Sequence, residues 1–154
     1  DGGPGGDDGG VELTGLVINE IVASNDFGAL DEEGEAEDWL ELYNNSGADI
    51  DLTGWHLWDN DPDNLLWEFP AGTTIANGDY LMIWCDEDPG FSELHASFKL
   101  TADGETITLY DDDDAVADEV TFPALETDTS YGRNPDGSDT WAIFDTPTPE
   151  AANE

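Results

Sequence analysis

Positive charge is almost absent from this sequence. Lys99 and Arg133 are its only lysine and arginine, and they stand against 39 acidic residues, so the formal net charge is −37. A protein that binds nucleic acid must neutralise phosphates, and one that binds an anionic membrane surface needs basic side chains. The composition therefore argues against nucleic acid and anionic membranes as partners.

Cysteine and long hydrophobic runs are also scarce. Cys85 is the single cysteine, so no internal disulfide can form. It lies in the apolar run YLMIWC, where a lone thiol is expected to be a buried core residue. No apolar run approaches the ~18–20 residues of a membrane-spanning helix, so we expect no transmembrane segment.

The motifs of common catalytic sites are missing too. The chain has no G-x-S-x-G elbow, no glycine-rich phosphate loop and no Ser/His/Asp set at a known spacing. Glu20 with Glu41, or Glu41 with Asp38, would suit acid/base work on a glycan, but such a pair needs a cleft, of which the sequence gives no sign. His56 and His95 lack a partner at metal-ligand spacing, so we interpret both as ordinary strand residues. We expect a protein that is not an enzyme.

Hydrophobic and aromatic residues are plentiful enough for one folded domain. They make up 38% of the 154 residues and include six tryptophans and six phenylalanines. Short segments that alternate between apolar and polar residues are separated by Gly, Asn, Asp and Pro, which is typical of strands and turns. We expect strands at 16–22, 65–69, 80–85, 97–100, 105–110 and 116–122, with more at 38–60 and near the end. Eight or nine short strands without a helical period predict an all-β sandwich.

The stretch 38–60, DWLELYNNSGADIDLTGWHLWDN, is expected to form a β-hairpin. Leu40 and Leu42 alternate with polar and aromatic residues, as in a half-buried strand. Turn residues follow at 44–47, and a second apolar set begins at Ile50. Gly54 interrupts this second strand, which indicates a bulge or a close backbone approach.

Several motifs resemble the lamin tail domain, in the branch found in secreted bacterial proteins. They are DWLELYN (38–44), DLTGW (51–55), FPAGTTIANGDYLMIW (69–84), SFKLTADGETITLYD (97–111), VTFPAL (120–125), SYGRNPDGS (130–138) and TPTPEAAN (146–153). The resemblance covers nearly everything from Val17 on and implies an immunoglobulin-like β-sandwich. Glu150 departs from the pattern, since the ending of the family more often has glycine there. Arg133 lies in a motif that appears structural in the family, and we expect it to pair with a carboxylate or with backbone carbonyls.

The chain divides into two parts. Residues 1–13 begin DGGPGGDDGG, which is typical of a flexible linker or tether, and residues 14–154 form the sandwich domain. The Gly/Asp stretch resembles the spacer behind the lipid-anchored cysteine of bacterial surface lipoproteins. We therefore expect an extracellular or cell-surface protein, either secreted or tethered as a lipoprotein.

Carboxylates crowd three expected loops, and calcium is the candidate cofactor because it prefers oxygen ligands. The candidate ligands are Asp59, Asp61 and Asp63, then Asp31 and Glu33, and finally Asp111 and Asp113. The stretch 59–64 resembles the opening of an EF-hand loop but lacks the glycine and glutamate that such a loop requires. Solvated turns, or adaptation to high salt, would explain the same carboxylates without a bound ion.

These observations predict a non-catalytic module for adhesion, anchoring or assembly. Its partner would be a cell-surface or wall component or a second copy of the chain, reached through the N-terminal tail or an edge strand. One alternative is a calcium-binding acidic protein. Another is a carbohydrate-binding module appended to a secreted enzyme, with Trp58 and Trp67 as sugar platforms, although tryptophans in a sandwich more often lie in the core.

Overall fold

The computed structural model describes residues 11–88 and 92–153. In these ranges the chain forms twelve strands and no helix, so it contains no helix that could span a membrane. The strands are β1 (Gly15–Val22), β2 (Trp39–Asn45), β3 (Ile50–Asp51), β4 (His56–Trp58), β5 (Trp67–Glu68), β6 (Thr74–Ile75), β7 (Tyr80–Cys85), β8 (His95–Ala96), β9 (Glu105–Tyr110), β10 (Val116–Phe122), β11 (Ser130–Arg133) and β12 (Trp141–Phe144). Four of them, β3, β5, β6 and β8, have only two residues, so the longer strands match the number expected.

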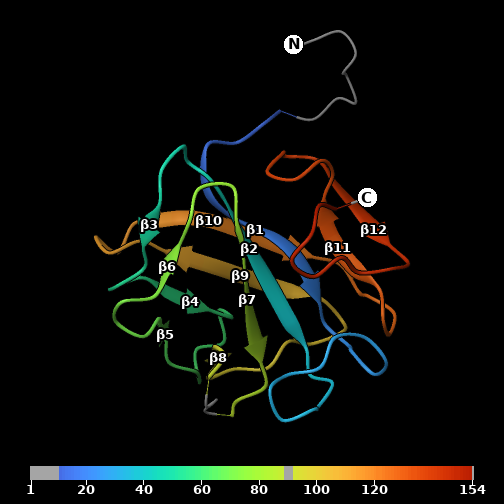
Figure 1. Ribbon diagram of the computed structural model, residues 1–154. Coiled ribbons are helices and arrows are strands. Elements are labelled where there is room, and N and C mark those ends of the chain that lie inside the picture. The colour runs from blue at the N-terminus through green and yellow to red at the C-terminus, as the bar shows by residue number, and fades with distance from the viewer. Residues whose placement is uncertain (1–10, 89–91, 154) are drawn as a thin grey trace, which may run out of the picture.

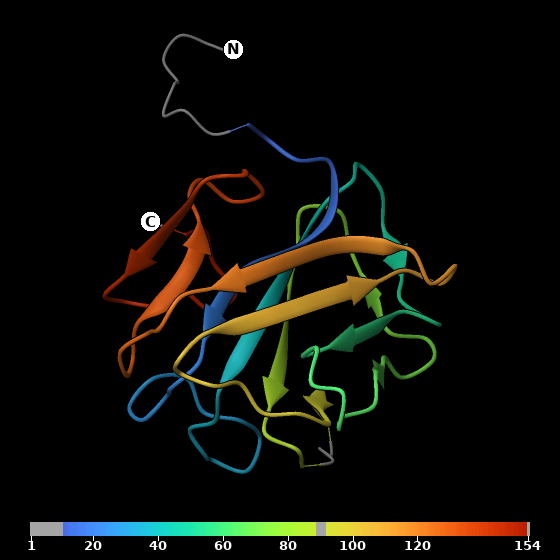
Figure 2. The same cartoon turned by 180° about the vertical axis from the view of Figure 1, so that it is seen from behind.

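Two sheets lie face to face and form the expected β-sandwich. One has six strands in the order β12-β11-β1-β2-β7-β8, and the other has four in the order β10-β9-β4-β5, while β3 and β6 pair separately. Figure 1 shows the first sheet in front, and Figure 2 shows β9 and β10 covering it from behind. All pairings are antiparallel except that of β7 with β8.

The core lies between the two sheets. Ile18, Leu40 and Ile83 reach it from the six-stranded sheet, and Leu57 and Ile107 reach it from the four-stranded sheet, all fully buried. Each such side chain contributes about 1.5–3 kcal/mol on burial. The apolar half of the alternation in each strand therefore faces the opposite layer, as a sandwich requires.

The expected hairpin at 38–60 is wrong. β2 pairs with β1 and β7, whereas β3 pairs with β6 and β4 pairs with β5 and β9. The chain crosses from one layer to the other after Asn45, and Leu42 and Leu57 meet in the same core from opposite sides. Two strands on facing layers show the same alternation as two strands of a hairpin, so the pattern alone did not distinguish them. Gly54 has a φ of +87° in a turn closed by Trp55 N–H and Leu52 C=O, so it is not a bulge. The alternative, a close approach, fits better, because a Cβ at this position would lie 3.2 Å from Asp112 Cβ.

Two further expected strands differ from the structure. The segment 65–69 is paired only at Trp67–Glu68, and Leu65 is 84% exposed. The segment 97–100 is not a strand, although Phe98 and Leu100 are buried in the core. An irregular segment can therefore bury alternate apolar side chains just as a strand does. The short strand of this region lies earlier, at His95–Ala96.

Arg133 on β11 links the two sheets. Its Nε donates to Ile18 O at 2.8 Å, its Nη1 to Ser138 O at 2.6 Å, and its Nη2 to Asp118 Oδ2 at 2.9 Å. The guanidinium carbon also lies 4.4 Å from the ring centroid of Trp141. The residue is 3% exposed, so the expectation that it pairs with a carboxylate and with backbone carbonyls is confirmed.

Residues 11–13, at the end of the expected linker, run beside the loop after β11. Val11 N donates to the Asp139 carboxylate, Asp139 N donates to Val11 O, and Leu13 N donates to Gly137 O. Residues 1–10 lie outside the described residues, and so does any contact of the N-terminal tail with a second copy.

Candidate metal centre and buried carboxyl groups

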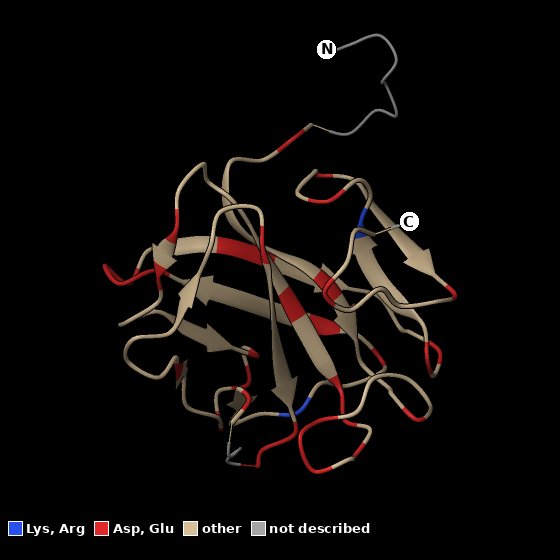
Figure 3. Cartoon of the chain, viewed as in Figure 1, with Lys and Arg blue, Asp and Glu red and all other residues tan. Residues whose placement is uncertain are grey.

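Acidic residues are spread over the loops around the sandwich and also occur in its strands, as the red segments of Figure 3 show. Of the two basic residues, Arg133 is buried and Lys99 is exposed. The described surface is therefore almost uniformly negative. The carboxylates in its loops have few basic side chains nearby with which to form ion pairs.

The carboxylates at 59–63 serve the turn that they form. Asp59 Oδ1 accepts from Asp61 N at 3.1 Å, and Asp61 Oδ1 accepts from Asp63 N at 2.9 Å. Within the described ranges, the oxygens of these three residues do not gather into one group of metal-ligand dimensions. Burial, together with the charges of Asp59 and Asp61, raises the pKa of Glu105 to about 7.

The tip of the β9–β10 hairpin gathers Asp111, Asp112 and Asp113. One oxygen from each lies within 4.8 Å of the others. Asp111 Oδ1 accepts from Asp113 N and Ala115 N, both at 2.9 Å, and so closes the turn, while the other two side chains are exposed. This arrangement is that of a solvated turn with one carboxylate holding its backbone.

The loop between β1 and β2 is organised by Asp31, which is 8% exposed. Asp31 Oδ1 accepts from the backbone N–H groups of Glu33 and Glu35, both at 2.9 Å. Gly34, at a φ of +82°, allows the tight return that these bonds require. Of the two expected ligands here, Asp31 is therefore buried, whereas Glu33 is exposed.

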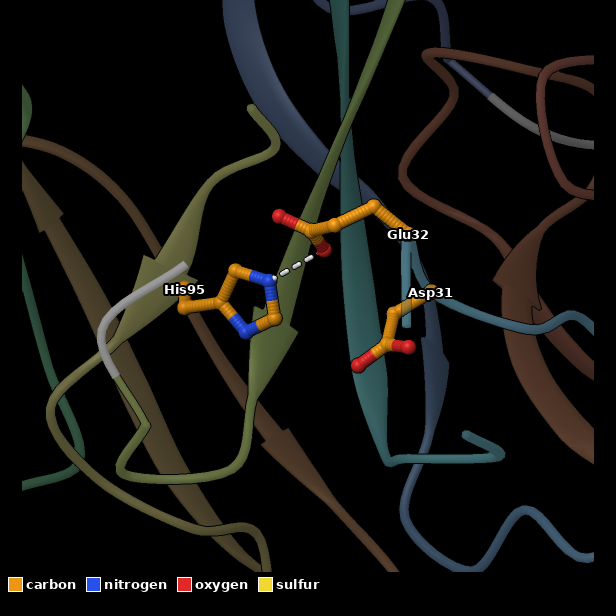
Figure 4. Close-up of side chains that lie close together, drawn as sticks. All are labelled: Asp31, Glu32 and His95. Carbon is orange, nitrogen blue, oxygen red and sulfur yellow. Dashed lines mark hydrogen bonds and ion pairs between the residues drawn. The ribbon is translucent and has the colours of Figure 1, made fainter. Parts of the chain in front are cut away.

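His95 on β8 brings this loop to the edge of the six-stranded sheet. Its Nε2 lies 2.7 Å from Glu32 Oε1, and its Nδ1 lies 2.8 Å from Asp86 Oδ2. Asp31, Glu32 and His95 each place a possible ligand atom within 4.8 Å of the others, and Figure 4 shows their side chains gathered at one place. The imidazole is 1% exposed.

Electrostatics at His95 favour a positive charge. Burial alone would lower the pKa of His95, but hydrogen bonds to Glu32 and Asp86 outweigh it and raise the pKa above the ordinary 6.5. His95 lies in a strand as expected, but its two carboxylate partners were missed. Glu32 is 63 positions away in the sequence, so no spacing pattern could have linked the two residues.

A second group of acids lies on the outer face of the same sheet. Glu20 on β1 stands opposite Glu41 on β2, and both are fully buried. The C-terminal segment 145–153 covers them: Thr148 N donates to Glu20 Oε2, and Glu150 N donates to Glu41 Oε2. Burial, with the nearby charge of Glu20, raises the pKa of Glu41 to about 9, so this carboxyl is neutral at pH 7.

Glu150 occupies the position where the family pattern has glycine, and its backbone explains the preference. Its φ is +60°, in the left-handed region that costs a non-glycine residue about 1–2 kcal/mol. We expect Glu150→Gly to raise the free energy of unfolding by about 0.5–1 kcal/mol, after the greater freedom of glycine in the unfolded chain is subtracted. Urea unfolding measures the change.

Glu150→Ala is the matched control for this prediction. It removes the same charge but keeps a Cβ in the left-handed region, so we expect less stabilisation than for glycine. Equal stabilisation by alanine would assign the effect to the charge and contradict the backbone explanation.

Neither tryptophan proposed as a sugar platform lies flat on open surface. Trp58 is half-buried, and its Nε1 donates to Asn64 O at 3.1 Å. Trp67 packs against the core, and its ring centroid lies 4.7 Å from that of Phe69. Both side chains thus contribute to packing around β4 and β5.

The sequence was compared with models of known protein families. The model of the Lamin Tail Domain matches residues 13–124, which begin two residues before β1 and end just after β10. A search among curated proteins found no match. The matched part contains β1 to β10, and therefore the Glu41 strand and the His95 cluster, while β11 and β12 lie beyond it. The chain belongs to the lamin tail domain family.

Proposed function

We propose that this chain is a non-catalytic extracellular or cell-surface module that anchors or assembles with a partner protein by binding an extended segment along β7. The observation that carries the proposal is a length of sheet edge that no described strand covers, beside a pocket with both apolar and acidic walls. The Glu20–Glu41 pair supports the non-catalytic part, because segment 145–153 covers it and glycosidase carboxylates need an open cleft.

The edge belongs to the first half of β7. On one side, β7 pairs with β2 from Tyr80 to Trp84. On the other side, only Trp84 and Cys85 pair with β8, so among the described residues no strand faces Tyr80–Met82. Trp84 N donates towards β8, to Leu94 O, and the N–H of Met82, two residues earlier, points to the same side. An added strand can therefore continue the sheet here.

A pocket of about 340 Å³ opens beside this edge. Its lining residues are Ala29, Leu30, Tyr80, Leu81, Met82, Trp84, Ser92, Glu93, Leu94, Pro149 and Glu150. Leu30 is 58% exposed, and Phe27 in the same loop is 91% exposed. Large exposed apolar side chains next to a pocket are typical of a binding surface.

The chemistry of the pocket indicates the kind of segment that fits. Apolar walls with two carboxylates, Glu93 and Glu150, suit a strand that alternates apolar with basic side chains. The net charge of −37 favours a basic partner in general. The N-terminal tail of a second copy carries aspartate and has no apolar side chain at 1–10, so it fits this pocket poorly.

Selection from a random peptide library on the purified chain tests the proposal. We expect enriched peptides to alternate apolar and basic residues, and to protect the Met82 N–H from hydrogen exchange when bound. Leu30→Asp should weaken a selected peptide at least about tenfold, because a charge replaces an apolar contact worth about 1.5–3 kcal/mol. Fluorescence polarisation with the labelled peptide measures the affinity.

Ile143→Asp on β12 is the matched control, since Ile143 is also exposed on an edge strand of the same sheet. We expect it to bind the selected peptide like the unaltered chain. An affinity that falls equally in both variants, or selected peptides that leave Met82 unprotected, would count against binding at β7.

A further inference from the structure

We propose that Asp31, Glu32 and His95 bind one divalent transition-metal ion of the zinc type, with Asp86 as the residue that orients the histidine. The site adjoins the β7 binding surface, since Glu32 Oε2 accepts from Ser92 N and Glu93 N, and both residues line that pocket. It shares Asp31 with one of the acidic loops expected to bind calcium, but it adds a histidine. It joins the β1–β2 loop to β8 through a buried nitrogen ligand.

The orientation of His95 is the first reason. Asp86 Oδ2 lies 2.8 Å from Nδ1, and its side chain is 2% exposed. Nε2 lies 2.7 Å from Glu32 Oε1, so both ring nitrogens face carboxylates. A metal ion would replace the proton on Nε2, while Nδ1–H would keep its bond to Asp86 and hold the ring towards Glu32 and Asp31. A carboxylate behind a histidine is the usual second-shell arrangement at protein zinc sites.

The ligand set is the second reason. Asp31 Oδ1 is engaged with two backbone N–H groups, while Oδ2 has no hydrogen bond among the described residues. One nitrogen and two carboxylate oxygens leave a fourth position for water, which is the composition of an open zinc site. Calcium takes six to eight oxygen ligands, which these residues do not supply. Ligand atoms around zinc lie about 3.3 Å apart, so side chains now within 4.8 Å need only small rotations.

Charge is the third reason. The three carboxylates of Asp31, Glu32 and Asp86 lie around one imidazole in a buried or half-buried setting. No lysine or arginine makes an ion pair with them among the described residues. A divalent ion held here brings two positive charges to this cluster.

Titration with Co²⁺ and Zn²⁺ at high ionic strength tests the site. In about 1 M NaCl the sodium ions already screen the surface carboxylates, so added Zn²⁺ gives heat only by binding at a specific site. We expect calorimetry to show one Zn²⁺ per chain. Co²⁺ bound at the same site should give visible ligand-field absorption. We expect His95→Gln to weaken Zn²⁺ binding by about 100-fold or more and Asp86→Asn by about 10–100-fold. His56→Gln, which changes the other histidine of the chain, should leave the affinity unchanged.

A measurement on the unaltered chain covers the case in which a variant fails to fold. The chain has two histidines, so the ring nitrogens give a simple NMR spectrum, and Zn²⁺ should shift Nε2 of His95 and leave the His56 ring in place. The absence of saturable Zn²⁺ heat, an unchanged affinity in folded His95→Gln, or a Zn²⁺ shift at His56 in place of His95 would each overturn the proposal.

Discussion

Replacing Arg133 with methionine is expected to lower the free energy of unfolding by about 3–5 kcal/mol. The guanidinium donates to Ile18 O, Ser138 O and the Asp118 carboxylate in a setting where it is 3% exposed. Methionine fills much of the volume but removes the side-chain donor from two carbonyls and the charge partner from Asp118, which keeps the N–H groups of Ile18 and Glu119. Buried polar groups that lose a partner are costly. Unfolding in urea, an uncharged denaturant, measures the loss of unfolding free energy. About 1 M NaCl screens the surface charges.

Lys99→Met is the control, because Lys99 is the other basic residue and is exposed. It removes the same unit of charge, and we expect a change within about 0.5 kcal/mol. Arg133→Lys should also be destabilising, since one ammonium does not reach three acceptors in the geometry of a planar fork. A similar loss in the Lys99 and Arg133 variants would mean that net charge, and not the buried network, sets the stability.

Replacing Glu41 with glutamine is expected to remove a large part of the pH dependence of stability. The pKa of Glu41 is about 9 in the fold against an ordinary 4.5, because the side chain is buried next to other carboxylates. Between these values the folded state binds one more proton than the unfolded state, so stability falls by about 1.4 kcal/mol per pH unit as pH rises. Between pH 6 and pH 8, the titration of Glu41 alone lowers the free energy of unfolding by about 2.7 kcal/mol. Glutamine stays neutral, so the variant should lose this decline.

Urea unfolding of both proteins at pH 6, 7 and 8 gives the comparison, and the difference between them isolates Glu41 from other titrating groups. Glu126→Gln removes one carboxylate from an exposed loop position and should keep the slope of the unaltered chain. Parallel pH curves for the unaltered chain and Glu41→Gln would show that Glu41 is charged in the fold.

Local sequence was a good guide to strands and a poor guide to their partners. Alternation and turn residues predicted the segments that became β1, β7, β9 and β10, and the long-range outcome was a sandwich as expected. The failure at 38–60 arose because inward-facing residues look alike whether the next strand lies beside them or across the core. Phe98 and Leu100 show a related limit, since both are buried without a strand.

The site was less predictable than the fold. Asp31 was named as a ligand from its acidic surroundings, but Glu32 and His95 were not, because the pairing of β7 with β8 brings them together. Glu20 with Glu41 was one of the two carboxylate pairs considered from the sequence, the other being Glu41 with Asp38, and the pairing of β1 with β2 places the first pair side by side. Their burial depends on segment 145–153, which crosses the sheet from the far end of the sequence. A contact of that range leaves no local trace in either partner.

The central place of β1 has a consequence for the order in which the chain folds. β1 needs β11 on one side, with Glu20 opposite Gly132, and is completed by segment 145–153 laid over Glu20 and Glu41. Loops of this length must close before their contacts contribute, so we expect a slow folder in the millisecond-to-second range. During synthesis, the edge of β1 that pairs with β11 therefore stays unpaired until the ribosome has made nearly the whole domain.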